Sequence, residues 1–221
     1  MGGYINFCYN TGDISSYGNG NVGGIAGWSS SGYITNCANF AVTSSNGENT
    51  GGIIGWNNNS SVNTCYNAGT INGGSHTGGI SGRNINSNVD TSYSSGSVFG
   101  HDYVGGISGR NTNSTVEYCV SLGKTITGNS NVARITVNGT MSDNRARAKM
   151  TVTINGTVFP VSGNANDING EDVPYGTWLS DAFGYGWWQQ TWNMPGTKLH
   201  PNCELPSLRN IADGQPVPRL E

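Results

Sequence analysis

Apolar residues in the first 137 positions occur in runs of one to three, separated by short runs rich in glycine, asparagine and serine. Ile5, Cys8 and Ile14 set this spacing, and similar arrangements return near residues 34, 62, 89 and 116. Short apolar alternations between turn-forming residues are typical of β-strands. Because no window before residue 140 has helical periodicity, the pattern predicts an all-β structure.

Two sequence blocks recur with one period. The first reads GGIAG, GGIIG, GGISG and GGISG, and its leading glycines follow at steps of 28, 27 and 27: Gly23, Gly51, Gly78 and Gly105. The second is an I/V-x-x-C-Y-N-x-G-x-I block, whose third apolar position is Cys8, Cys37, Cys65, Ser92 and Cys119. Two independent columns with the same period indicate stacked repeats.

A 27–28-residue period made of strands and turns predicts a β-solenoid, in which coils stack about 4.8 Å apart. We predict a right-handed parallel β-solenoid (β-helix) of about five coils, because parallel crossovers are nearly always right-handed. By strand alternation, Gly23, Ile25 and Gly27 should face inward together. Three columns should fill the core: Ile25, Ile53, Ile80, Ile107 and Ile135; Ile5, Ile34, Val62, Val89 and Val116; and Ile14, Val42, Ile71, Val98 and Ile126.

The regularity decays after residue 137. We divide the chain into solenoid repeats (1–137) and a C-terminal closing coil with an aromatic-rich β cap (138–221), packed as one domain with the solenoid. Residues 150–161 read as a hairpin, and the tryptophan-rich segment should plug the last coil, since an open end exposes core and strand edges. The array begins in mid-repeat, so we expect further repeats or domains before it.

The GGIxG blocks, each followed by an I/V-x-x-C-Y-N-x-G-x-I block, resemble the GLUG motif repeats of bacterial surface and secreted proteins. These include repeat regions of IgA-type metallopeptidases and of adhesin-like proteins. The resemblance covers residues 2–137, with Ala133-Arg134 in place of Gly-Gly and Ser92 in place of Cys. It implies an extracellular or cell-surface module of a larger bacterial protein and says little about chemistry.

Composition narrows the possible functions. Only 10% of the residues are charged, against roughly 25% in average soluble proteins, and the net charge is −3. This leaves no basic surface for nucleic acid. No apolar run is long enough to predict membrane insertion.

One column is a candidate binding surface. It consists of Trp28, Trp56, Arg83 and Arg110, which should leave the core face. Tryptophan and arginine are enriched at binding hot spots, and flat indole faces also suit sugar rings. The alternative is a ladder that stacks only on itself through aromatic and cation–π contacts.

Other residues receive mainly structural interpretations. The tryptophans Trp178, Trp187, Trp188 and Trp192 could form a sugar platform, although we favour a cap. Asp167, Asn169 and Asp172 are weak Ca²⁺ candidates, because the turn departs from the EF-hand pattern. The cysteines should stack as free thiols, and Asn10, Asn39, Asn67, Ser94 and Ser121 should form a hydrogen-bonded ladder. We expect no cofactor and no metal.

These patterns favour a non-catalytic surface module that acts in adhesion or as a presenting spacer, with a host or cell-surface protein or a glycan as its partner. The alternatives are a carbohydrate-binding or glycan-active β-helix, or the accessory repeat region of a surface metallopeptidase. Glycan cleavage needs paired carboxylates, and we expect no two of the early acidic residues to share a rung position. His76 and His101 should be exposed loop residues.

Overall fold

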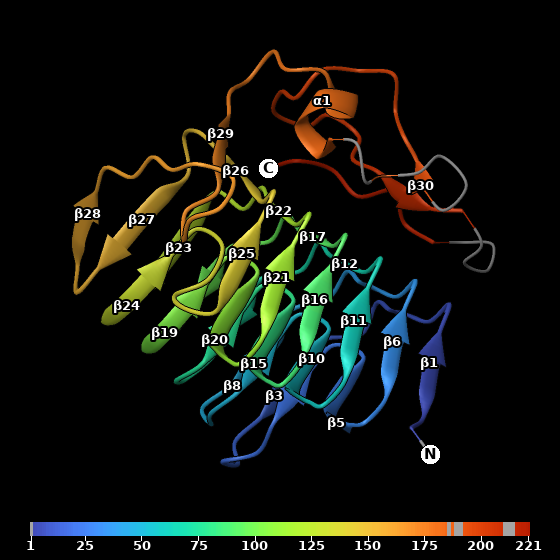
Figure 1. The fold of residues 1–221 in the computed structure, drawn as a ribbon, viewed down its shortest axis with the longest axis vertical. Coiled ribbons are helices and arrows are strands. Elements are labelled where there is room, and N and C mark those ends of the chain that lie inside the picture. Colours follow the sequence, from blue (N-terminus) through green and yellow to red (C-terminus); the bar gives the residue numbers. More distant parts are fainter. Residues whose placement is uncertain (1, 185–186, 188–191, 210–214) are drawn as a thin grey trace.

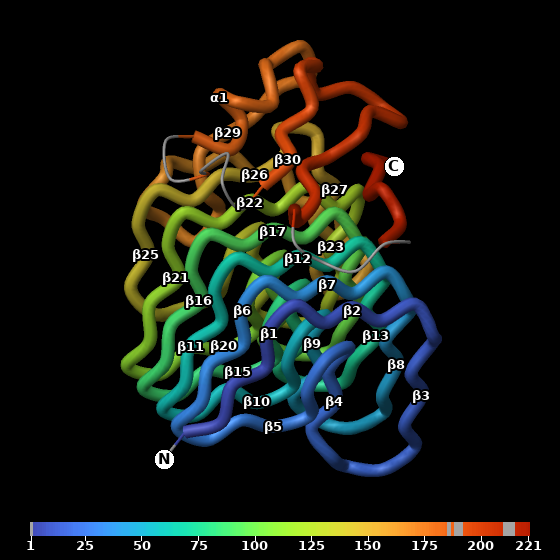
Figure 2. The backbone as a smooth tube through the Cα atoms, turned by 90° about the vertical axis from the view of Figure 1, so that its right-hand side faces the viewer, coloured from blue at the N-terminus to red at the C-terminus, as the bar shows by residue number. Residues whose placement is uncertain are grey.

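The computed structural model describes residues 2–184, 187, 192–209 and 215–221. Over these residues the chain forms a β-solenoid of stacked parallel strands (Figure 1). One sheet contains six strands, so the chain completes about six coils, which agrees with the predicted five repeat coils and closing coil. Viewed from the N-terminal end, the chain runs clockwise as it recedes, which makes the solenoid right-handed (Figure 2).

Each coil passes through five sheets, numbered here in the order in which the chain meets them. The first sheet contains β1 (Tyr4–Asn6), β6 (Tyr33–Thr35), β11 (Ser61–Asn63), β16 (Asn88–Asp90), β21 (Thr115–Glu117) and β25 (Thr140–Ser142). The second contains β2 (Tyr9–Asn10), β7 (Ala38–Asn39), β12 (Tyr66–Asn67), β17 (Tyr93–Ser94), β22 (Val120–Ser121), β26 (Arg145–Arg147) and β29 (Glu171–Val173).

The other three sheets complete the coil. The third contains β3 (Ile14–Ser16), β8 (Thr43–Ser45), β13 (Ile71–Asn72), β18 (Val98–Phe99), β23 (Thr125–Gly128), β27 (Thr151–Ile154) and β28 (Thr157–Phe159). The fourth contains β4 (Val22–Gly23), β9 (Thr50–Gly51), β14 (Thr77–Gly78), β19 (Asp102–Gly105) and β24 (Ser130–Ala133). The fifth contains β5 (Ala26–Ser30), β10 (Ile54–Asn58), β15 (Ser81–Ile85) and β20 (Ser108–Thr112).

The paired glycines lie at a corner of the coil, where the first glycine ends one strand and the second lies in the bend before the next strand. Gly23 ends β4, and the chain bends at Gly24 and Ile25 before β5 begins. A Cβ atom on Gly79 would lie 2.1 Å from the carbonyl oxygen of Gly106 in the next coil. The predicted inward alternation of Gly23, Ile25 and Gly27 is therefore wrong, and the glycines instead allow close backbone approach between coils.

The predicted core columns are confirmed from the second coil onward at every position but one, whereas Ile5, Ile14 and Ile25 of the first coil are only partly buried. The isoleucine column is fully buried from Ile53 onward, and Val62, Val89 and Val116 are also fully buried. The prediction for Val42 is wrong, because this side chain is 36% exposed and Thr43 is the register partner of Ile71. The first coil is longer than the predicted step, as the pairing of Ile5 with Ile34 and of Ile14 with Thr43 shows, so the inward position falls one residue later and Val42 faces outward.

Three corners of each coil use left-handed backbone. One corner column has φ values of 46° to 58°: Ser31, Asn59, Asn86 and Asn113. The others run through Phe7, Asn36, Thr64, Thr91, Tyr118 and Asp143, and through Asn49, His76, Tyr103 and Asn131. Asparagine tolerates this conformation better than most residues, which explains part of the asparagine content.

The C-terminal segment covers the side of the solenoid. The helix α1 (Leu179–Phe183) and the antiparallel pair β30 (Trp192–Asn193) and β31 (Ser207–Leu208) lie over the second sheet (Figure 2). Phe183 and Trp192 share one buried cluster with Tyr66 of β12 and Tyr93 of β17. The prediction that the tryptophans plug the last coil is therefore wrong, because the coil flank supplies their apolar partner.

The last coil is closed by other residues. β27 and β28 form the predicted hairpin around Asn155-Gly156, and carbonyl oxygens of residues 165 and 168 accept hydrogen bonds from the last coil. Arg134, which replaces the second glycine, is fully buried and forms an ion pair with Asp172 at 2.6 Å. In the described part of the chain, α1 is the sole helix, and no helix is long and apolar enough to span a bilayer.

Candidate binding surface

The column of Trp28, Trp56, Arg83 and Arg110, here called the Trp–Arg column, runs across the fifth sheet. Its members are direct register partners in β5, β10, β15 and β20. The two indole rings lie 6.3 Å apart at 41°, and the Arg83 guanidinium lies 5.4 Å from the centre of the Trp56 ring. Trp28 is 58% exposed, whereas the other three members are partly buried.

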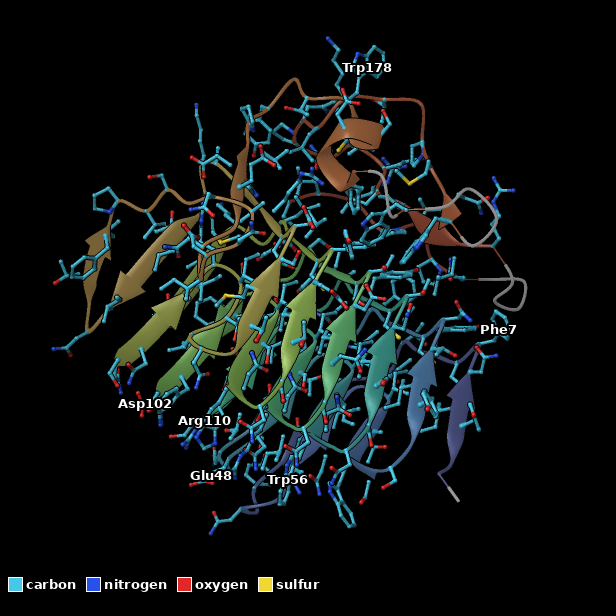
Figure 3. The ribbon with its side chains drawn as sticks, viewed as in Figure 1. Phe7, Glu48, Trp56, Asp102, Arg110 and Trp178 are labelled. Carbon is cyan, nitrogen blue, oxygen red and sulfur yellow. The ribbon has the colours of Figure 1, made fainter. Side chains whose placement is uncertain are left out.

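The column continues into the neighbouring corner. The Arg110 guanidinium lies 5.0 Å from the Tyr103 ring and its Nη1 lies 3.5 Å from His76 Nε2. His76 Nδ1 lies 3.0 Å from Asn49 Oδ1, and its ring packs on Tyr103. Trp56, Arg110, Glu48 and Asp102 are all found at the edge of the molecule opposite Trp178 (Figure 3).

His76 is buried at 8% exposure, so the prediction of an exposed histidine is wrong at this position. Burial lowers the pKa of His76, and the nearby charges of Arg110 and Arg83 lower it further. Glu48 and Asp102 act in the opposite direction. The imidazole therefore favours its neutral form beside two cations.

Contacts within the Trp–Arg column leave several of its hydrogen-bond donors without partners. Within the described residues, Trp56 Nε1 and the Nε atoms of Arg83 and Arg110 are buried without a hydrogen-bond partner. No ion pair among the described residues involves Arg83 or Arg110. Stacking thus accounts for the arrangement of the side chains and leaves both guanidinium charges unpaired.

The asparagine ladder is present and structural. Asn39 Nδ2 donates to Asn67 Oδ1 at 2.8 Å, and Asn67 Nδ2 donates to Ser94 Oγ at 3.3 Å. Asn67 also donates to the Gly69 carbonyl at 2.7 Å, which closes the adjoining turn. These three ladder residues are buried, so the ladder offers little surface to a ligand.

The cysteines are free thiols. Cys37, Cys65 and Cys119 are buried, and their thiols donate to main-chain carbonyls, as Cys65 Sγ does to Asn63 at 3.2 Å. Burial raises the pKa of the Cys65 thiol well above its usual value. Burial also raises the pKa of the Cys119 thiol, so Cys65 and Cys119 pack as small apolar side chains and are poor nucleophiles.

Two carboxylates do share a rung, contrary to the sequence prediction. Asp90 of β16 and Glu117 of β21 are register partners on the outer face of the first sheet. Burial raises the pKa of Glu117, and the charges of Asp90 and Asp143 add to this effect. The 27-residue step between these two residues was visible in the sequence and equals the repeat period.

The structure gives the cap tryptophans mostly structural positions. Trp187 and Trp192 are buried within the cap cluster, and Trp188 lies outside the described residues. Trp178 is half exposed, and the Lys198 ammonium lies 5.1 Å from its ring centre. The described residues therefore do not form the flat, continuous platform considered from the sequence.

The candidate Ca²⁺ ligands make protein contacts. Asp167 accepts hydrogen bonds from the backbone N–H groups of Asn164, Asn169 and Gly170. Asn169 Oδ1 accepts from the Arg134 N–H, and Asp172 pairs with the buried Arg134 guanidinium. These contacts organise the turn that closes the last coil.

One surface feature was not found from the sequence. A polar groove follows the corner between the fifth and first sheets, where strands of three coils end and the next begin. Its asparagines and serines were interpreted only as turn residues. The available signal was the recurrence of Asn59, Asn86 and Asn113 at the repeat period.

Comparisons with known proteins agree with this architecture. Residues 100–127 match the family model described as the GLUG motif. The chain is similar to a crystal structure described as that of "a putative immunoglobulin A1 protease from Bacteroides ovatus", with 19% identity and a TM-score of 0.61. The alignment covers 93% of this chain and 64% of that chain. No match to a curated protein was found.

Proposed function

We propose that this chain is a non-catalytic contact module of a larger secreted or cell-surface bacterial protein, acting in adhesion to a host or cell-surface protein or glycan. The Trp–Arg column carries the proposal. It is an in-register line of exposed or partly buried aromatic and cationic side chains on a surface otherwise rich in asparagine, serine and threonine. Such side chains are the usual anchors of binding interfaces.

The GLUG match and the likeness to a structure described as an IgA1 protease support a surface or secreted setting. They also fit an accessory repeat region of a surface metallopeptidase. The chain spans 64% of that structure. Its sequence carries no HExxH zinc motif, so in this alternative the peptidase site would belong to another part of a longer protein.

Adhesion of coated microspheres to epithelial cell layers tests the proposal. Beads that carry the wild-type chain should bind well above albumin-coated beads. The double variant Trp28→Ala/Trp56→Ala should reduce binding about thirtyfold or more, since the loss of one hot-spot side chain costs about 2 kcal/mol or more. Trp178→Ala, an exposed tryptophan on the opposite edge, is the matched control and should leave binding unchanged.

The outcomes separate the alternatives. Binding no greater than that of albumin beads argues against adhesion and favours a spacer. Binding that survives the double variant moves the contact surface away from the Trp–Arg column.

A glycan-active protein is the second candidate, because Asp90 and Glu117 lie side by side and the pKa of Glu117 is raised. Carboxylates in close pairs perform glycoside hydrolysis, one as acid and the other as nucleophile or base. Release of reducing ends from polysaccharides, abolished by Glu117→Gln, would support this candidate. No release by the wild-type chain would exclude it for the substrates used.

A further inference from the structure

The corner groove between the fifth and first sheets has the chemistry of a ligand site. It has a volume of about 270 Å³ and lies across three successive coils. Its lining includes the polar side chains of Tyr33, Asn59, Ser61, Asn86 and Asn88. From this arrangement we infer that the groove binds a neutral oligosaccharide, with the glycan chain lying along the solenoid axis.

The hydrogen-bonding groups of the groove match sugar hydroxyls. Each asparagine amide offers two donors and an acceptor, and a hydroxyl group of a sugar is both donor and acceptor. Within the groove, Asn86 Nδ2 donates to Asn59 Oδ1 at a long 3.4 Å, and Ser61 Oγ donates to Asn88 Oδ1. Among the described residues, Asn86 Oδ1 and Asn88 Nδ2 form no hydrogen bond, so they remain available to a ligand.

An aromatic surface extends the groove along the first sheet toward the N-terminus. Tyr33, which lines the groove and is 46% exposed, stacks on Tyr4 with ring centres 5.0 Å apart and planes at 13°. Tyr4, Tyr33, Ser61 and Asn88 are successive register partners on the outer face of the first sheet. A sugar ring can pack its apolar face on the tyrosines while the next rings contact the amides.

Charge selects a neutral ligand over an acidic one. None of the residues that line the groove is charged. Asp90 is two residues beyond Asn88 and so lies on the same face of β16, and its register partner Glu117 adds a second negative charge. An acidic sugar chain would meet these carboxylates without a compensating cation in the groove.

The repeat spacing also fits an extended chain. Coils advance by about 4.8 Å, which is close to the length of one pyranose residue in an extended glycan. Each coil therefore places its own lining side chains beside a successive sugar ring. This inference rests on the proposed function, because it names the class of ligand that the contact module would bind. It places that ligand in the corner groove and not on the Trp–Arg column.

Isothermal titration of the whole chain with purified hexaoses tests the site. The neutral probes are cellohexaose, maltohexaose, mannohexaose and the hexamer of N-acetylglucosamine, and hexagalacturonate is the acidic probe. We expect at least one neutral hexaose to bind with a millimolar or lower Kd and hexagalacturonate not to bind. Failure of all four neutral probes at about 10 mM, or equal binding of the acidic probe, would overturn the inference.

Glycine substitutions isolate the amides from the backbone. Asn59 and Asn86 have φ values of 46° and 47°, and glycine adopts this conformation without strain. Asn59→Gly/Asn86→Gly should weaken binding about tenfold, because each removes one or more hydrogen bonds to the ligand. Asn113→Gly, at the same corner one coil beyond the groove, is the matched control and should bind as wild type.

The same variants distinguish this inference from the proposed function. Unchanged hexaose binding by Asn59→Gly/Asn86→Gly overturns the groove, whatever the microsphere assay shows. If Trp28→Ala/Trp56→Ala loses microsphere adhesion and the wild-type chain binds no hexaose, the Trp–Arg column is the contact surface and the groove is not a glycan site.

Discussion

Asparagine performs three different tasks in this chain, and its position within the coil decides which. Asn67 is buried in a ladder, Asn86 turns a corner with left-handed backbone, and Asn88 points outward from a strand. The amide suits all three because it can donate and accept together and tolerates positive φ. A low charge content follows, since amides and hydroxyls supply most of the polar surface.

The buried ladder should contribute strongly to stability. Asn67→Leu preserves the approximate side-chain shape but removes one acceptor of Asn39 Nδ2, which keeps its bond to the Ala41 carbonyl, and removes the Asn67 donor from the Gly69 carbonyl. Each buried polar group that loses its partner costs about 1–3 kcal/mol, so we expect a loss of roughly 3 kcal/mol. The urea unfolding midpoint measures this.

The control for the ladder is Asn46→Ala, which truncates an exposed turn asparagine and should leave the midpoint nearly unchanged. Equal midpoints for Asn67→Leu and Asn46→Ala would show that the ladder is not a source of stability.

At the scale of the element, the Gly-Gly corner sets how closely coils can stack. Gly79→Ala would place a Cβ atom 2.1 Å from the Gly106 carbonyl oxygen and 2.5 Å from Ser94 Oγ. The backbone oxygen cannot move aside cheaply, so we expect a loss of about 3 kcal/mol or failure to fold. Gly20→Ala adds a methyl group with nothing within 4 Å and should change thermal stability little.

If the glycines set the spacing of the coils, Gly79→Ala must be measurably less stable than Gly20→Ala. If both melt at the wild-type temperature, the coils can adjust their spacing and the glycines are dispensable.

The corner that contains His76 should make stability depend on pH. Because the folded protein lowers the pKa of His76, the unfolded chain takes up this proton first. Stability should therefore fall as pH decreases below about 6.5, the ordinary pKa of histidine, and should stop falling below the lowered folded value. Urea midpoints between pH 7.5 and pH 5 measure the slope.

Asn occupies the same corner position in the preceding coil, at Asn49, and two coils further along, at Asn131. His76→Asn should therefore keep the backbone and reduce the slope, whereas His101→Asn, at an exposed histidine, should retain it. A slope that persists unchanged in His76→Asn would assign the pH dependence to other groups.

At the scale of the whole molecule, the solenoid followed from the sequence because its signal is periodic. Repeated columns average out local ambiguity, so the core positions and the parallel stack were predictable. The error at Val42 arose where one coil is a residue longer, and the error at Gly23 arose where a corner interrupts the alternation. Both depend on local backbone geometry that a period does not encode.

The cap and the candidate sites were harder to predict because they occur once. No repeated column indicates that Trp192 packs on Tyr66 and Tyr93, which are 126 and 99 residues earlier. The Trp–Arg column was predictable, whereas the rung shared by Asp90 and Glu117 was missed although its spacing equals the period. The groove requires side chains from three coils and the corner geometry that brings them together.

The position of the cap predicts which sheets are destabilised when the packing of the cap is weakened. Trp192 is 1% exposed, with its ring centre 6.0 Å from that of Tyr66, 5.7 Å from that of Tyr93 and 4.6 Å from that of Trp187. Trp192→Ala should cost about 3–5 kcal/mol of cap packing, because the cavity cannot collapse against the rigid sheet.

Amide hydrogen exchange locates this loss. Exchange should accelerate in α1 and β31 and over the second sheet, while β10 and β15 of the fifth sheet, outside the cap cluster, keep their protection. Trp178→Ala, at a half-exposed indole, should leave the exchange pattern unchanged. If coils are coupled only to their nearest neighbours, the loss of stability should stay within the cap and the second sheet. Uniform acceleration of exchange across all five sheets in Trp192→Ala would instead mean that cap and solenoid unfold as one cooperative unit.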